Sequence, residues 1–134
     1  YNSAKVQETN TNKNASLTFF WRDLERQIRV EGKVEKVTKK ESDDYFMSRP
    51  EGSRIGAWAS PQSKEITSRK EIEDAVEAIK NKFDGKEVTR PQNWGGLRLV
   101  PTYFEFWQGA SNRLHDRIVY EFVKGMWKKK RLAP

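Results

Sequence analysis

The sequence contains no cysteine, a single histidine and no long run of apolar residues. Without cysteine the chain can form no disulfide, no thiolate nucleophile and no zinc–thiolate site. A metal centre built from several histidines is also excluded, so no metal is expected. A membrane-spanning helix needs roughly 18 or more apolar residues, and no such span is present. Because no signal peptide is visible either, the sequence suggests a cytoplasmic protein.

Charged and aromatic side chains are what the chain has in quantity. Charged residues make up 34% of the 134 residues and hydrophobic residues only 35%, while aromatic residues reach 12%, with five Trp. Disordered chains are poor in aromatic residues, so this composition indicates a folded protein whose core depends on large rings. The length fits a single domain over residues 1–134.

The net charge of +7 indicates a protein that attracts anions. Phosphorylated small molecules and nucleic acid both qualify, and charge alone does not separate them. The densest basic run is Lys128–Arg131, and its simplest interpretation is a solvated strand end.

Alternating apolar and polar residues over 26–37 predict a strand with one wet face, and an apolar run predicts another strand over 16–21. The polar residues 1–15 suggest a loop or a frayed helix. After Pro91, glycine and proline separate four further predicted strands, at 97–100, 103–108, 117–122 and 126–132. Short antiparallel strands in this number usually close into a barrel or a sandwich.

Two capping boxes, Thr38–Glu41 and Ser68–Glu71, predict helix starts, because a hydroxyl and a carboxylate there satisfy free backbone N–H groups. The first predicts a short helix through Met47, which Pro50 prevents from continuing. The second predicts an amphipathic helix that stops near Gly85.

Three basic residues, Arg113, His115 and Arg117, alternate along the predicted start of a strand. Alternation places them on one sheet face, and grouped cations are tolerated where an anion lies among them. A solvated edge strand would show the same pattern, so both interpretations stay open on these residues alone. A basic, aromatic, mainly β protein would also suit an oligonucleotide-binding barrel.

Several separate segments form a recognisable set: LERQIRVEGKVEK at 24–36, YFMSRPEGSRIGAWAS at 45–60, Gln62–Ser63, WGG at 94–96, EFWQG at 105–109, NRLHDR at 112–117 and RLAP at 131–134. In residues, order and spacing these segments resemble the pyridoxine/pyridoxamine 5'-phosphate oxidase family. The resemblance covers essentially the whole chain.

The resemblance implies an FMN-binding split β-barrel, mainly β with helices and of the antiparallel Greek-key type. It implies a homodimer with its sites at the subunit interface. The implied reaction oxidises pyridoxine 5'-phosphate or pyridoxamine 5'-phosphate to pyridoxal 5'-phosphate, with O2 as electron acceptor and H2O2 as product. FMN would carry the redox chemistry. Neither nucleic acid nor a membrane is an expected partner on this resemblance.

By the same resemblance, Tyr45, Arg49 and Ser53 would bind the substrate phosphate. A guanidinium fork and two hydroxyls suit phosphate oxygens. Arg113 and His115 would contact the substrate ring and are the candidate catalytic residues, with Arg113 stabilising developing negative charge.

The resemblance assigns the FMN contacts to Lys5, Gln27, Gln62, Ser63, Trp107 and Arg117. Trp94 and the two glycines after it are expected to be structural. The chain departs from the family pattern at Ala4, where the family usually has an arginine that grips the FMN phosphate. Losing that contact would cost about 1.5–3 kcal/mol if nothing replaces it.

The resemblance also implies that the chain begins inside the family's domain, so that N-terminal strands and a substrate-contacting lysine are absent from it. On this hypothesis the chain is the C-terminal portion of an active oxidase. The alternative is a non-catalytic split-barrel module that holds FMN or pyridoxal phosphate, or a basic barrel that binds nucleic acid.

Overall fold

The computed structural model describes residues 1–134, and the chain forms two compact units. The helical unit combines residues 1–11 with 36–97. The sheet unit combines residues 12–35 with 98–134. Each unit is built from two separate stretches of sequence, and each is described below by itself.

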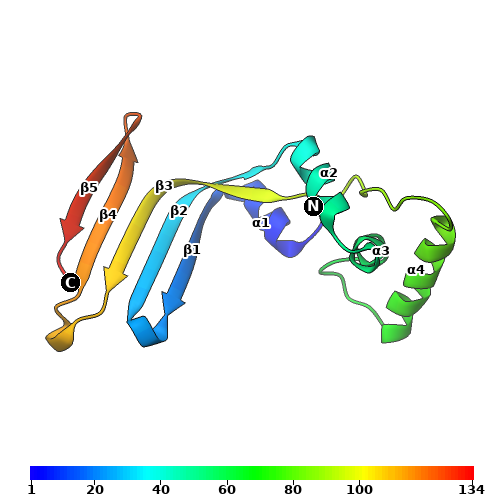
Figure 1. Ribbon diagram of the computed structural model, residues 1–134, viewed down its shortest axis with the longest axis horizontal. Helices are drawn as coiled ribbons and strands as arrows, with labels where there is room; N and C mark the ends of the chain where they lie inside the picture. The colour runs from blue at the N-terminus through cyan, green and yellow to red at the C-terminus, as the bar shows by residue number, and fades with distance from the viewer. The chain divides into compact units, whose positions relative to one another are not determined.

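The sheet has five strands in the order β1-β2-β3-β4-β5 (Figure 1). Their bounds are β1 Asn14–Trp21, β2 Arg26–Lys36, β3 Leu97–Gln108, β4 Asp116–Val123 and β5 Met126–Leu132. The expected antiparallel, mainly β fold with helices is confirmed. Strands that are neighbours in the sheet are also neighbours in sequence, so no Greek-key crossover occurs among them, and β1 and β5 lie at the sheet edges.

The strands predicted at 97–100 and 103–108 are wrong as separate elements, because β3 continues through Pro101. Proline has no N–H to donate to a neighbouring strand. At this point the backbones of β2 and β3 come very close. A Cβ atom on Gly32 would lie 2.0 Å from the carbonyl oxygen of Val100 and 2.8 Å from the Cα of Pro101. Only glycine fits at this position of β2.

The cross-strand register sorts the side chains of the sheet onto two faces. The apolar face carries rings and aliphatic chains, of which Phe19 is 47% and Phe106 41% exposed. The polar face carries Arg29, Glu105 and Arg117. The wet face expected for β2 is therefore only partly right, since Arg29 pairs with two carboxylates. The apolar face comprises Leu17, Phe19, Ile28, Val30, Phe104, Phe106, Ile118 and Tyr120.

The helical unit contains α1 Ala4–Thr11, α2 Lys39–Ser48, α3 Glu51–Ala59 and α4 Arg69–Lys82. Its core is formed by Phe46, Ile55 and Val88, and aromatic rings pack around them. The edge of Phe46 meets Trp94 with 5.0 Å between ring centroids. The composition thus correctly indicated a core that depends on aromatic side chains. None of the helices is both long and apolar enough to cross a membrane.

One of the two predicted capping boxes forms. The Thr38 hydroxyl accepts the Glu41 N–H at 3.2 Å, and the Glu41 carboxylate accepts the Thr38 N–H at 2.9 Å. The second box is wrong, because the Ser68 side chain makes no capping bond. The Glu71 carboxylate instead accepts the N–H of Thr67 at 3.2 Å. The helix α4 still forms, because its apolar residues pack on the core.

Replacing Gly32 by alanine is expected to destabilise the protein by roughly 1–3 kcal/mol or more, since the new methyl group would meet the β3 backbone. The measurement is the denaturant midpoint of unfolding. Gly52→Ala is the matched control, because nothing lies within 4 Å of that position and it is part of α3. A Gly32→Ala midpoint equal to that of the wild type would contradict the close approach of β2 and β3.

Candidate functional site

Arg49 and Ser53 line a cavity of about 410 Å³ in the helical unit, together with Gln62. Arg49 caps the C-terminus of α2, Ser53 lies in the first turn of α3, and Gln62 lies in the turn after α3. Pro50 separates the two helices, as the sequence indicated. Arg49 and Ser53 therefore reach the same cavity across a break and not along one continuous helix face.

Trp94 belongs to this cavity, although the sequence suggested only a structural role. Its ring stacks on Tyr45 with 6.1 Å between centroids, and the Cζ atom of Arg49 lies 5.3 Å from the centroid of the indole. Arg90 donates to the carbonyl oxygen of Trp94 and pairs with Asp43 at 2.6 Å. Tyr45 therefore does not line the cavity itself but contacts Trp94, which does, and the largely buried side chain of Arg90 holds that tryptophan in place.

The lining of the cavity favours an anion. It contains the cationic side chains of Arg49 and Lys64, the hydroxyl of Ser53 and the amide of Gln62, but no aspartate or glutamate. A guanidinium with hydroxyl and amide donors beside it is a suitable environment for phosphate oxygens. Tyr1 also lines the cavity, and no sequence pattern linked it to residues so distant along the chain.

The other sequence-predicted residues of the helical unit lie on α1 and in the turn after α3. Lys5 is an exposed residue in the first turn of α1, directly after Ala4. Ser63 follows Gln62 and has a positive φ of 63°. The turn is closed by a hydrogen bond from the Lys64 N–H to the Pro61 carbonyl oxygen at 2.9 Å.

The sheet unit gathers a second group of predicted residues. Gln27 lies on β2, Trp107 on β3 and Arg117 on β4, and the register places all three on the polar face. Trp107 and Arg117 are direct cross-strand partners. The group therefore offers an amide, an aromatic ring with an indole N–H, and a guanidinium from three adjacent strands.

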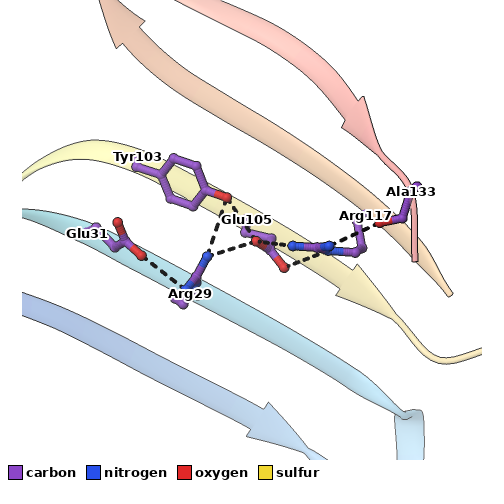
Figure 2. A network of polar contacts seen from close by, with 6 residues as sticks. All are labelled: Arg29, Glu31, Tyr103, Glu105, Arg117 and Ala133. Atoms are coloured by element: carbon purple, nitrogen blue, oxygen red, sulfur yellow. Dashed lines mark hydrogen bonds and ion pairs between the residues drawn. The ribbon is translucent and has the colours of Figure 1, made fainter.

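Glu105 holds the Arg117 guanidinium by two hydrogen bonds, Nε to Oε1 and Nη2 to Oε2, each 3.1 Å long (Figure 2). The third guanidinium nitrogen donates to the Ala133 carbonyl oxygen at 3.0 Å. The same carboxylate accepts from Arg29 at 3.0 Å and from the Tyr103 hydroxyl at 2.8 Å. Because the Glu105 side chain is only 6% exposed, it forms a buried junction between β2, β3 and β4.

The charges of this junction stabilise one another. Hydrogen bonding from Arg117 holds the pKa of Glu105 below its ordinary value, and the Tyr103 hydroxyl and the charge of Arg29 act in the same direction against the effect of burial. The hydrogen bond to Glu105 in turn raises the pKa of Arg117. Glu105 is not among the residues to which the sequence pointed. The available signal was an acidic residue in the middle of a predicted strand that is otherwise rich in aromatic residues.

Arg113 and His115 lie in the turn before β4 and not on the strand. Arg113 ends a short 3-10 turn and has a positive φ of 60°. The alternation of Arg113, His115 and Arg117 along one strand is therefore a wrong prediction, and only Arg117 projects from β4. The physical reason is that Asn112 and Arg113 have left-handed backbone conformations, which an extended strand does not contain, so β4 begins only at Asp116.

Gln27, Trp107 and Arg117 form the polar-face group, and His115 nevertheless contacts it. Its ring lies 4.7 Å from the Trp107 ring, centroid to centroid, and its Nδ1 atom accepts the N–H of Ala110 at 3.2 Å. Because Nδ1 acts as the acceptor in this contact, the donor role of the ring falls to Nε2. His115 is then a donor through Nε2.

Comparison with solved structures identifies the class of protein that has this fold. PhzG from Burkholderia lata, solved with tetrahydrophenazine-1-carboxylic acid, matches with a TM-score of 0.88 and 30% identity, over 99% of this chain and 65% of that chain. A pyridoxamine 5'-phosphate oxidase-related, FMN-binding protein from Nostoc punctiforme matches with a TM-score of 0.71 and 14% identity, over 99% of this chain and 69% of that chain. The fold is thus the split-barrel fold of these proteins.

The sequence comparisons then define the family. Residues 1–83 match the model for pyridoxamine 5'-phosphate oxidase, and residues 94–134 match the pyridoxine 5'-phosphate oxidase C-terminal dimerisation region. The chain belongs to the pyridoxamine 5'-phosphate oxidase family.

Curated relatives with the name pyridoxine/pyridoxamine 5'-phosphate oxidase match over 100% of this chain. The relative from Pseudomonas entomophila is 55% identical, and 62% of its length is covered. The relative from Microcystis aeruginosa is 52% identical, and 63% of its length is covered. The chain therefore spans less than two thirds of the length of the relatives it matches.

Acid should selectively weaken the Glu105 junction. Because the folded-state pKa of Glu105 is lowered, its contribution to stability is present above its ordinary pKa of 4.5 and is lost as the pH falls through the folded-state value. At neutral pH, Glu105→Gln is expected to cost roughly 3 kcal/mol. That difference from the wild type should shrink below pH 4.5, measured as the free energy of unfolding at each pH.

Glu121→Gln is the matched control for this measurement, because Glu121 on β4 lies on the same polar face as Glu105 but forms a more exposed pair with Lys130. Its loss should cost less than about 1 kcal/mol. A constant difference between Glu105→Gln and the wild type across the acid range would contradict the lowered pKa.

Proposed function

We propose that the protein is an FMN-dependent oxidase that converts pyridoxine 5'-phosphate or pyridoxamine 5'-phosphate to pyridoxal 5'-phosphate, with O2 as electron acceptor and H2O2 as product. Family membership and the names of the curated relatives support this activity. The structural observation that carries the proposal is the polar-face group, in which Gln27, Trp107 and Arg117 come together from three strands, with His115 on the Trp107 ring.

The polar-face group has the chemistry that FMN requires. Gln27 and Trp107 supply amide and indole donors for the polar edge of a flat heterocycle, and the Trp107 ring supplies a wall. Arg117 supplies positive charge that would offset negative charge on the reduced ring. When bound, FMN would supply the redox chemistry, with O2 as the final electron acceptor. Gln62 and Ser63 are further proposed contacts, and Lys5 would pair with the FMN phosphate.

Three residues at the cavity of the helical unit, Tyr45, Arg49 and Ser53, are proposed to bind the substrate phosphate. Arg49 supplies the charged fork, Ser53 a hydroxyl donor, and Tyr45 a phenol held on Trp94. No acidic side chain lines the cavity to compete with the phosphate for Arg49. The positive charge is therefore available to a dianionic ligand.

Arg113 and His115 are proposed to act on the substrate ring. The exposed Arg113 guanidinium would orient the ring and stabilise negative charge as it develops. His115 would donate through Nε2, because Nδ1 is already engaged by the Ala110 N–H. In this role His115 binds a substrate oxygen through that donor.

The match of residues 94–134 to a dimerisation region supports a homodimer, and we place the sites at its subunit interface. The cytoplasmic location and the single-domain organisation remain predictions from the sequence.

A non-catalytic module is the second candidate, and Ala4 is the observation that favours it. Ala4 begins α1 next to Lys5 and removes one cation that the family resemblance would place there. The nucleic-acid version has less support, because Lys130 pairs with Glu121 at 2.7 Å and Arg131 pairs with Asp116 at 3.3 Å. Part of the basic run on β5 is thereby neutralised.

A visible spectrum tests the proposed function directly. The purified protein with added FMN should retain a flavin spectrum after gel filtration. Adding pyridoxine 5'-phosphate without oxygen should bleach it, and air should restore it with release of H2O2. Unphosphorylated pyridoxine is the matched control and should bleach the flavin far more slowly at equal concentration. A flavin that stays oxidised with both compounds would overturn the oxidase proposal in favour of a binding module.

Arg49→Ala should raise KM for pyridoxine 5'-phosphate by about tenfold or more, because a charge-assisted contact to phosphate is lost. The turnover number should change much less, since the phosphate is remote from the reacting carbon. Arg69→Ala is the control, because Arg69 is exposed on α4 and pairs with Glu73 at 3.1 Å. Equal KM values for Arg49→Ala and the wild type would exclude the cavity as the phosphate site.

A further inference from the structure

The Glu105 carboxylate accepts hydrogen bonds from three different side chains, whereas Glu121 on the same face accepts from one. Glu105 accepts four hydrogen bonds, two from Arg117, one from Arg29 and one from Tyr103. Figure 2 shows Glu105 in the middle of the group, with Arg29 on one side and Arg117 on the other. Arg29 has a second carboxylate partner, Glu31, at 3.2 Å, whereas Glu105 is the only carboxylate that pairs with Arg117.

The two bonds between Glu105 and Arg117 constrain orientation as well as position. A bidentate contact through Nε and Nη2 fixes the plane of the guanidinium, and the bond from Nη1 to Ala133 fixes its outer end. If the carboxylate were removed, the Arg117 side chain could rotate and would no longer keep this single orientation. Of its five N–H groups, three are used within the protein, and the remainder are available to a ligand.

The carboxylate itself is held by neighbours that do not belong to the proposed ligand contacts. Tyr103 donates to Oε2 from two residues earlier on β3, and Arg29 donates to the same oxygen from β2. The ring of Tyr103 also lies 5.4 Å from the Cζ atom of Arg29, measured to the ring centroid. These contacts connect Arg29 on β2, through Glu105 on β3, to Arg117 on β4.

We infer that Glu105 is a positioning residue for FMN binding, which acts by presenting the Arg117 guanidinium beside Trp107 in one fixed orientation. This inference rests on the proposed function, in which Arg117 contacts FMN. It goes beyond the family assignment of contacts, because Glu105 acts on the cofactor only through Arg117. Glutamine cannot replace it, since an amide offers one acceptor oxygen and turns an NH2 group toward the guanidinium donors.

A double-mutant cycle on FMN affinity tests the inference. Glu105→Gln is expected to weaken FMN binding by about tenfold or more, measured by fluorescence titration of the protein with FMN. In an Arg117→Ala background the same substitution should have almost no further effect, because the residue it positions is gone. Glu121→Gln, which removes a polar-face carboxylate bound to Lys130, should leave FMN affinity unchanged in both backgrounds.

A second readout does not depend on FMN. In the protein without added flavin, the Arg117 Nε–H group should give a resolved NMR signal with slow solvent exchange, because it is bonded to a buried carboxylate. Glu105→Gln should shift and broaden that signal, and Glu121→Gln should not. All titrations are made without denaturant. Unfolding curves first establish that each variant is folded under these conditions.

The outcomes separate the two claims. Wild-type protein that binds no FMN, while its Arg117 signal responds to Glu105→Gln as expected, would overturn the proposed function and leave the positioning of Arg117 supported. An equal loss of FMN affinity from Glu105→Gln with and without Arg117 would overturn the positioning role and show that Glu105 acts through the fold in general. An Arg117 signal that is unchanged in Glu105→Gln would also overturn it.

Discussion

The buried carboxylate of Glu105 is the interaction on which the polar face of the sheet depends. A charge taken out of water is tolerated only when it is paired and fully hydrogen-bonded. Glu105 meets this requirement with donors from β2, β3 and β4, so these strands must keep the register that brings Arg29 and Arg117 to it. The same register places Trp107 opposite Arg117. The constraint that satisfies a buried charge therefore also assembles the proposed flavin contacts.

The cavity of the helical unit depends on a different feature, which is the break between α2 and α3. Pro50 ends α2 and begins a new helix, and this brings Arg49 and Ser53 to one cavity. Trp94 then joins the cavity to the core, because its ring contacts Phe46 on one side and Tyr45 and Arg49 on others. Large rings serve both purposes here, which explains how a chain with few aliphatic residues can build a core and a polar cavity together.

Local sequence signals succeeded where the determining contacts are themselves local. The capping box at Thr38 and the break at Pro50 need only residues close in sequence, and both are found as predicted. The same kind of signal was wrong where a distant segment intervenes. The strand β3 passes through Pro101, at the point where Gly32 of β2 lies against it. The alternation around His115 ends in a left-handed turn at Arg113 before β4 begins.

The sequence by itself determined most of the strands and the helices α2 and α4, because periodicity and capping signals are encoded along the chain, and its motifs identified the family by resemblance. The resemblance named Gln27, Trp107 and Arg117 among six expected FMN contacts. Only the tertiary structure decided how these residues are supported. Glu105 and Trp94 acquire their roles from partners far away in sequence, namely Arg29 and Arg117 for the first and Tyr45 and Arg49 for the second. Such roles depend on strand register and on helix packing, and neither is encoded in the residues next to them.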